Sequence, residues 1–286
     1  MIKYGLAAMV AAAILSGCAT TRQDLAGPTV ISFDHGATDT LVELGLEDKL
    51  VAIPKRGLPD YLDDLAEGRP DAGNLKVPDL DVVRAVAPDL VLVTGRQSES
   101  LDDLEAIAEV QDVSLLGDDY REAVRIRVLG LATLYGQYEQ AETRLTELWQ
   151  YVAKERKAIE GNPQVVVVTH NQGNFSLRDE PVVSQLLALG RPAVPAGVEP
   201  VTRGTRVFIP VTPAVLAEMA PAHLFVVDRS AAIGDEPLDA ETLRQALAAG
   251  GAEDVPVTVL SPELWYLSGG GLQSVRLQVQ EIVDAL

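Results

Sequence analysis

The sequence predicts an α/β protein made of two similar lobes that one long helix joins. Three observations lead to this fold class. Apolar, strand-like runs alternate with helical segments along the chain. A pattern of helix, strand and arginine occurs twice, 133 residues apart, and a 24-residue amphipathic segment lies between the two copies. With 286 residues the chain can form one or two domains with a large core.

Seven apolar runs are predicted as strands. Several are continuous runs of Val and Leu, which is typical of parallel strands that are buried on both faces. We expect these strands at residues 29–33, 50–53, 90–94, 113–116, 165–169, 224–227 and 257–260.

The repeated pattern indicates two related lobes. Residues 83–96 read VRAVAPDLVLVTGR, and residues 216–229 read LAEMAPAHLFVVDR. Each copy contains the end of a helix, an Ala-Pro stop, a buried strand and an arginine, because proline cannot continue the helix. The first strand of each half also ends in a histidine, His35 or His170, before a helix that ends in Leu-Gly.

A long helix is predicted between the repeats, at residues 137–160. Its apolar residues recur at four-three-four spacing, and Gly161-Asn162-Pro163 follows it. Such a helix is about 36 Å long, enough to reach from one lobe to the other. The alternative is an ordinary long surface helix within one domain. We expect an N-terminal lobe at 28–136, the bridging helix at 137–160 and a C-terminal lobe at 161–286.

The first residues indicate export. Lys3 precedes an apolar run that is too short to span a bilayer, which needs about 20 residues, and Leu-Ser-Gly-Cys follows. This tetrapeptide resembles the bacterial lipobox, in which the cysteine carries lipid. We expect a signal peptide at 1–17, a membrane anchor through lipid on Cys18 and a tether at 18–27, with the choice of membrane left open. The alternative is a cleaved protein without lipid.

Composition and motifs exclude several functions. A net charge of −19 without a basic stripe argues against nucleic acid as a partner. Cys18 is the only cysteine, so the mature chain has no thiol nucleophile. The sequence contains no HExxH, GxSxG or GxGxxG motif, so we expect no catalytic residues and no cofactor. An exported enzyme that uses the region of His170 and Ser176 stays open as an alternative.

Arginines at strand ends are the strongest candidates for a binding site. Ligands of open parallel sheets bind beyond the carboxyl ends of the strands, where the repeat places Arg96 and Arg229, one in each lobe. A guanidinium stays charged and presents a rigid fork of donors, which suits an anionic ligand. Arg178 and Arg203 are further candidates. For each arginine, the alternative is a surface salt bridge.

Four segments resemble a family of bacterial lipoproteins that bind ferric siderophores, particularly catecholates, for uptake by ABC transporters. They are LPDYL at 58–62, GRQ at 95–97, FVVDR at 225–229 followed by AIG, and PELWYL at 262–267. The resemblance extends from about residue 29 to the C-terminus. It implies the class III periplasmic binding protein fold, with two Rossmann-like lobes bridged by one helix.

The resemblance also implies a site. Arg96 and Arg229 fall on family arginines that surround the anionic ferric complex, and Tyr266 falls on a cleft tyrosine that can bind Fe(III) directly. A phenolate is a hard oxygen ligand suited to that ion. Trp265 is expected to pack against the aromatic ligand. The same fold also binds haem, cobalamin and other iron chelates, which is the alternative ligand class.

Two positions of the cleft depart from the family pattern. Pro181 occupies the place of a third cleft arginine, with Arg178 three residues earlier. Arg203 occupies the place of the cleft histidine, so we expect charge rather than direct iron coordination to hold the ligand. We hypothesise that His35 or His170 supplies the missing imidazole. The alternative is that both histidines cap backbone groups.

The expected partner is an ABC permease that receives the ferric siderophore from a monomeric binding protein. Asp81 stands where the family's N-terminal lobe has a docking glutamate. Ala214 stands at the corresponding position of the C-terminal lobe, and Glu218, one turn later, is the candidate substitute.

Overall fold

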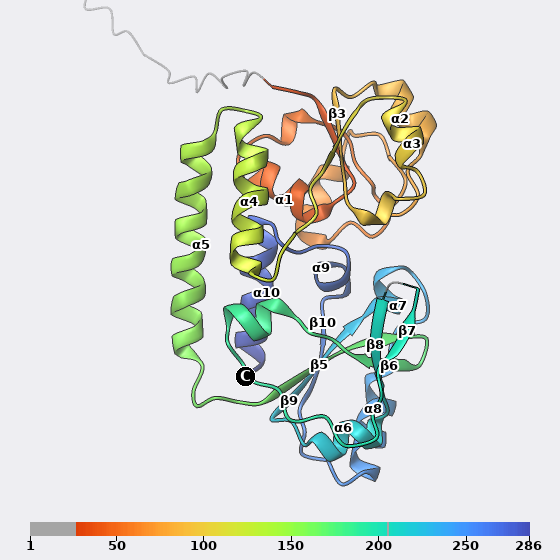
Figure 1. Ribbon diagram of the computed structural model, residues 1–286, viewed down its shortest axis with the longest axis vertical. Coiled ribbons are helices and arrows are strands. Elements are labelled where there is room, and N and C mark those ends of the chain that lie inside the picture. Colours follow the sequence, from red (N-terminus) through yellow and green to blue (C-terminus); the bar gives the residue numbers. More distant parts are fainter. Residues whose placement is uncertain (1–26, 205) are drawn as a thin grey trace, which may run out of the picture.

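A computed structural model describes residues 27–204 and 206–286. The chain forms two lobes, one above the other in Figure 1, and helix α5 (Tyr138–Ala158) runs alongside both of them. The predicted bridging helix is therefore confirmed, with its ends within two residues of the expected positions. The predicted signal peptide and Cys18 lie outside the described residues. Within the described ranges, no helix is both long and apolar enough to cross a bilayer.

The N-terminal lobe contains a parallel sheet in the order β2-β1-β3-β4. Its elements are β1 (Val30–Ser32), α1 (His35–Glu43), η1 (Glu47–Lys49), β2 (Leu50–Ala52), η2 (Asp60–Ala66), α2 (Leu80–Val86), β3 (Leu90–Val93), η3 (Gly95–Gln97), α3 (Leu101–Glu105), β4 (Glu109–Asp112) and α4 (Tyr120–Thr133).

The C-terminal lobe contains a mixed sheet in the order β10-β9-β5-β6-β8-β7. Strands β10, β9 and β5 are parallel, whereas β6, β8 and β7 extend the sheet in antiparallel pairs. Its elements are β5 (Val165–Asn171), β6 (Asn174–Leu177), the π-helical turn η4 (Val182–Leu186), β7 (Val201–Arg203), β8 (Arg206–Val211), α6 (Pro213–Met219), β9 (His223–Asp228), α7 (Arg229–Ala232), α8 (Ala240–Ala249), β10 (Val257–Leu260), α9 (Pro262–Tyr266) and α10 (Leu272–Ala285).

Six of the seven predicted strands are confirmed, and the strand at 113–116 is wrong. The edge strand β4 lies just before it and pairs with β3. Val113 is buried and still bonds to the backbone of Val93, but Leu116 is 75% exposed. An edge strand with one partner tolerates polar residues, so the apolar run did not mark the strand. The sequence prediction also missed β6, β7 and β8.

The repeat is confirmed at its helix stops. Helices α2 and α6 end at Ala87 and Ala220, which adopt left-handed conformations with φ of 45° and 44° before their prolines. The predicted similarity at the histidines is weaker, because His35 begins α1 and His170 lies within β5. The second predicted Leu-Gly helix is only the short turn η4.

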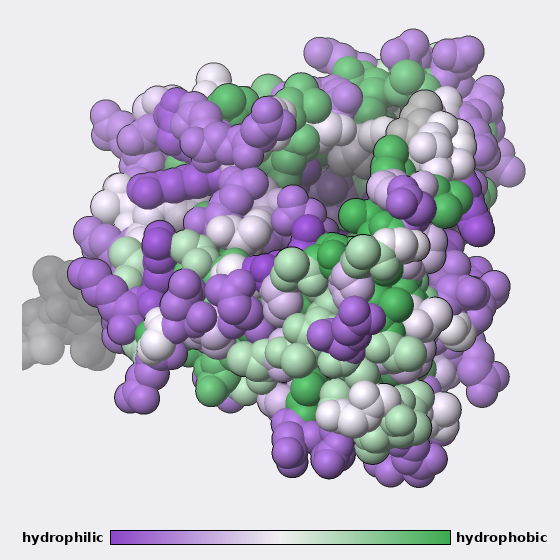
Figure 2. Space-filling model, turned by 60° about the horizontal axis from the view of Figure 1, so that its bottom comes forward, coloured by the Kyte–Doolittle hydropathy of each residue, from purple (hydrophilic) through white to green (hydrophobic). Residues whose placement is uncertain are grey.

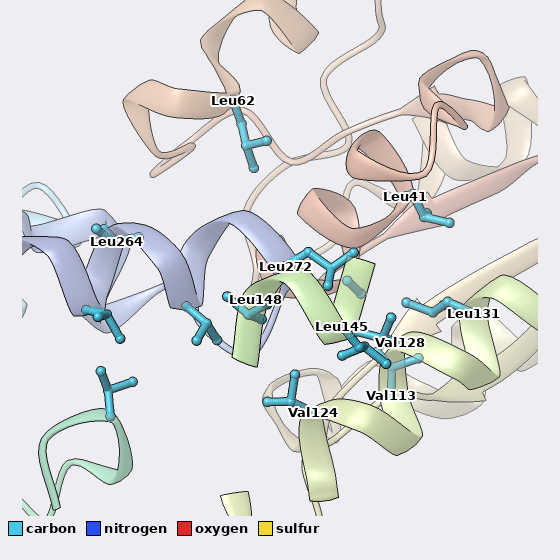
Figure 3. Close-up of a cluster of buried hydrophobic side chains, with 14 of the residues drawn as sticks. Leu41, Leu62, Val113, Val124, Val128, Leu131, Leu145, Leu148, Leu264 and Leu272 are labelled. Carbon is cyan, nitrogen blue, oxygen red and sulfur yellow. The ribbon is translucent and has the colours of Figure 1, made fainter. Parts of the chain in front are cut away.

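The largest cluster of buried side chains runs through both lobes. Figure 3 shows side chains from α1, α4, α5, α9 and α10 meeting in it, among them Leu41, Leu145, Leu148, Leu264 and Leu272. Helix α10 packs against α5, α1 and η4. The C-terminal helix therefore joins the N-terminal lobe to the C-terminal lobe.

The segment before α10 approaches the N-terminal lobe closely. A Cβ on Gly36 of α1 would collide with the carbonyl oxygen of Gly269. Asp39, fully buried on α1, accepts backbone N–H groups of Gln273 at 2.9 Å and Ser274 at 2.7 Å. These bonds cap the N-terminus of α10 from the other lobe. Burial raises the pKa of Asp39 to about 6.

Candidate functional site

A polar pocket of about 590 Å³ lies between the two lobes. Residues of the N-terminal lobe meet residues of α7 and α9 there. The face in Figure 2 is hollowed, with hydrophilic side chains inside the hollow. The lining residues are Arg56, Asn74, Leu75, Lys76, Val77, Gly95, Arg96, Ser98, Glu99, Arg229, Ala232, Ile233, Asp235, Tyr266 and Leu267.

Tyr266 lies between two arginines in this pocket, one from each lobe. The guanidinium carbons of Arg96 and Arg229 lie 5.4 Å and 5.5 Å from the centre of its ring. Arg229 Nε donates to the Tyr266 hydroxyl at 2.8 Å, and Arg96 Nη2 donates to the Tyr266 carbonyl at 2.8 Å. The predicted convergence of the two strand-end arginines is therefore confirmed. Cation–π contact holds both guanidiniums against the ring.

Two further cations of the pocket were missed by the sequence analysis. Arg56 follows β2 and donates weakly to the carbonyl of Ile233, at 3.4 Å. Lys76 lies 3.8 Å from Glu99 in an exposed pair, which contributes little. Arg56 follows a strand of the same parallel sheet as Arg96, so the strand-end rule could have found it. No sequence signal marked Lys76.

Arg178 is placed elsewhere than the sequence analysis suggested. Its Nε donates to Glu180 at 2.6 Å, and its Nη2 donates to the carbonyl of Trp265 at 3.2 Å. Glu180 is only 6% exposed, so this pair is largely buried. Both residues line a separate cavity of about 300 Å³ with Arg127 and Asp34. The charge of Arg178 is therefore neutralised by the protein itself.

Trp265 and Arg203 do not line the inter-lobe pocket. Trp265 is 1% exposed, and its Nε1 donates to Glu281 at 2.6 Å. Its indole is thus part of the core, and Trp265 lines the smaller cavity that contains Arg178. That it packs against a ligand stays a prediction. Arg203 lies exposed at the end of β7, on the outer edge of the mixed sheet.

The two histidines are buried, and neither lines the pocket. His35 is fully buried, and among the described residues its ring nitrogens form no hydrogen bond of ordinary geometry, with the backbone of Gly57 as a polar group that acts on the ring. Burial lowers its pKa to about 4, partly offset by the charge of Asp34. His170 is 3% exposed and bonds to Asp228 and the backbone of Gly173. Burial of both rings does not support the hypothesis that one of them presents an imidazole to the ligand.

The same bonds argue against an enzymatic site at His170. Its Nδ1 lies 2.8 Å from Asp228, and its Nε2 accepts the N–H of Gly173 at 2.9 Å. Ser176 is paired with Thr169 across β5 and β6. Both ring nitrogens are thus occupied by groups other than a serine, whereas a nucleophile must lie within hydrogen-bond reach of its base.

The candidate docking acids lie on equivalent helices. Asp81 is in the first turn of α2, with its side chain 96% exposed, and pairs with Arg84 at 2.9 Å. Glu218 is exposed near the end of α6. The two helices occupy the same place in the repeat, but the two acids do not occupy the same turn.

A two-lobed α/β fold with a polar pocket between the lobes and cations from both lobes defines a solute-binding protein. The family described as periplasmic binding protein matches residues 30–255, so the chain belongs to that family. Its fold is the class III fold of such proteins, with a parallel sheet in one lobe and a mixed sheet in the other. The family comprises substrate-binding proteins rather than enzymes.

Relatives support this assignment. The petrobactin-binding protein YclQ of Bacillus subtilis is 28% identical over 263 residues, which are 90% of this chain and 82% of the relative. The comparison with its crystal structure gives a TM-score of 0.78 and covers 91% of this chain and 92% of the crystallised chain. The iron-uptake substrate-binding protein PiuA of Streptococcus pneumoniae is 28% identical, with a TM-score of 0.79 and coverage of 91% and 93%.

Proposed function

We propose that this protein binds an anionic ferric siderophore of the catecholate class in the inter-lobe pocket and delivers it to an ABC permease. One observation carries the proposal: Arg96 and Arg229, from different lobes, converge on Tyr266 inside a pocket that also contains Arg56 and Lys76. Of the residues that the structure describes, four cations and two carboxylates line the pocket, so it is locally positive in a protein of net charge −19.

The named ligands of two relatives support iron-complex binding. YclQ is a petrobactin-binding protein, and a second relative, FatB of Vibrio anguillarum, is a ferric-anguibactin-binding protein that is 21% identical over 271 residues. Haem and cobalamin are less suited to the pocket, because an apolar cleft poor in arginine would favour those ligands.

Titration of residues 19–286 with ferric catecholate, hydroxamate and citrate complexes tests the proposal. Because Trp265 is buried in the core, calorimetry is preferable to tryptophan fluorescence alone. We expect the anionic catecholate complexes to bind at submicromolar concentration and a neutral hydroxamate complex to bind more weakly. No binding of any iron complex at micromolar concentration would refute the proposal.

Tyr266 is proposed to contact the ligand through its ring and to leave the iron to the siderophore. Arg229 already donates to its hydroxyl, and two guanidiniums hold the ring. Phenolate coordination of Fe(III) adds a visible charge-transfer band. We therefore expect the same visible spectrum for the complex bound to wild type and to Tyr266→Phe, and a new band in wild type alone would contradict this role.

Membrane anchoring and permease docking extend the proposal. Lipid on Cys18 would hold the monomeric protein at the periplasmic face of the envelope, with residues 18–27 as tether. Cys18→Ser should release it from the membrane fraction. Asp81 and Glu218 are exposed on equivalent helices, one in each lobe, as a permease contact requires. Charge reversal at both acids should abolish uptake and leave siderophore affinity unchanged.

A further inference from the structure

Two short connections support the pocket residue Arg229. Asn171 ends β5 and Arg229 begins α7, and Arg229 Nη1 donates to Asn171 Oδ1 at 2.6 Å. With Nε bonded to Tyr266, the guanidinium is held at two of its five donors. Among the described residues, no bond of the remaining donors is seen, so they can form a fork toward an anion. This orientation depends on how firmly Asn171 and the start of α7 are held.

The residues just before Asn171 and Arg229 bond to each other. His170 and Asp228 are directly paired in the register of β5 and β9. The His170 Nδ1 to Asp228 Oδ1 distance is 2.8 Å, and both side chains are buried. His170 Nε2 accepts the N–H of Gly173 at 2.9 Å, so the proton of the neutral ring lies on Nδ1 and is donated to Asp228.

Asp228 and Ser230 complete the connection. Asp228 also accepts the backbone N–H groups of Ala231 at 3.3 Å and Leu238 at 2.6 Å. Burial alone would raise the pKa of Asp228, but these bonds and the one from His170 hold it below its usual value. Ser230 Oγ accepts the N–H of Gln172 at 2.8 Å. The turn after β5 and the first turn of α7 are thus tied together beneath the pocket.

We propose that His170 is a positioning residue for the ligand site, which fixes Arg229 through its bonds to Asp228 and Gly173. The proposal rests on the proposed function, because it concerns the same pocket. The sequence suggested that an imidazole contacts the ligand. The ring of His170 lies instead one residue before Asn171 in the chain, among the residues that hold Arg229 in place.

Three substitutions separate the two bonds of His170. His170→Leu removes both, His170→Asn keeps a donor near the position of Nδ1, and His170→Gln keeps an acceptor near the position of Nε2. We expect His170→Leu to weaken binding of a ferric catecholate about tenfold, which is the size of one or two lost hydrogen bonds. His170→Asn and His170→Gln should each recover part of that loss.

His223, on the neighbouring strand β9, provides a matched control. It is also buried, with Nε2 2.8 Å from the hydroxyl of Thr258 and its ring stacked on Phe225, but it begins the strand that Asp228 ends. His223→Leu should lower thermal stability as much as His170→Leu and leave affinity unchanged. Equal losses of affinity in the two variants, or none in His170→Leu, would overturn the positioning role.

A second measurement needs no ligand. The Nε–H of Arg229 donates to Tyr266, so its NMR signal should exchange slowly with water in wild type and in His223→Leu. In His170→Leu we expect exchange at least about tenfold faster. If wild type binds no iron complex, the proposed function fails while this exchange still decides the positioning role. Equal exchange in wild type and His170→Leu would refute it.

Discussion

Replacement of Arg229 by alanine should weaken ligand binding, whereas replacement of Arg178 by alanine should destabilise the fold. Arg229 faces the inter-lobe pocket, and within the part of the chain that the structure describes its hydrogen bonds go to neutral groups, Tyr266 and Asn171. One unit charge about 5 Å from a ligand anion contributes about 3 kcal/mol at an effective dielectric constant of 20. Because Arg229 is partly exposed, screening reduces this to about 2 kcal/mol, or about 30-fold in Kd.

Arg178→Ala should instead affect folding. Its partner Glu180 is 6% exposed, so the variant leaves a buried carboxylate without its cation. Loss of one partner of a buried pair costs 3–5 kcal/mol, and the 29% exposure of the Arg178 side chain lowers our expectation to about 2 kcal/mol. The ligand Kd should stay within about threefold, because the pair has no net charge to offer the ligand.

Calorimetric titration with a ferric catecholate and thermal unfolding measure the two effects separately. Arg229→Ala should lower affinity at nearly constant melting temperature. Arg178→Ala should lower the melting temperature at nearly constant affinity, and the double variant Arg178→Ala/Glu180→Gln should recover stability. The reasoning is refuted if Arg178→Ala weakens binding as much as Arg229→Ala does.

Three further predictions concern the junction of the lobes. Gly36→Ala should destabilise the fold by about 2 kcal/mol, because its Cβ would collide with a backbone carbonyl. A Cβ on Gly130 of α4 would meet no atom of the described residues within 4 Å, so Gly130→Ala should not destabilise the fold; chemical denaturation checks both variants. The pKa of Asp39 is raised from 3.8 to about 6, so this group stabilises the folded state fully below pH 3.8 and loses that contribution as pH rises through about 6. In Asp39→Asn the free energy of unfolding should therefore depend less on pH across that range. Small-angle scattering should change little on ligand binding, since α5 and α10 both join the lobes; a large change would contradict this.

The repeat made the strand-end arginines predictable. In both copies of the repeat an Ala-Pro pair ends a helix, and a strand follows. Residues just after a parallel strand lie at the sheet edge where ligands bind. These rules depend only on neighbouring residues, so Arg96 and Arg229 could be assigned from sequence. The resemblance to the siderophore-binding family added Tyr266, which lies between them.

The sequence did not predict which groups bond to the side chains of Trp265, His170 and Arg178. Trp265 bonds to Glu281 on another helix, and His170 bonds to Asp228, 58 positions away. Arg178 has its partner only two residues away, but charge patterning does not show that Glu180 is buried. In each case the residue type suggested a contact with the ligand. In the folded protein the same side chain instead forms a hydrogen bond or ion pair with another residue of the chain. Prediction of the edge strands failed for a related reason, because a strand with only one neighbouring strand need not be apolar.

The C-terminal segment joins the lobes more tightly than a two-lobed repeat implies. Tyr61 bonds to Ser268 at 2.6 Å, Arg127 bonds to the carbonyl of Gly269 at 3.2 Å, and Asp39 caps α10. The segment that carries Tyr266 is therefore anchored to both lobes, and the pocket floor cannot move with one lobe alone. Because the two lobes are already joined in this way, ligand binding should cause little further ordering of side chains or closure of the lobes. Affinity in such a site must therefore come from charges that are already in place. Selectivity among anionic complexes should then follow from how Arg96 and Arg229 are held, which is the reason that the supporting bonds matter as much as the arginines.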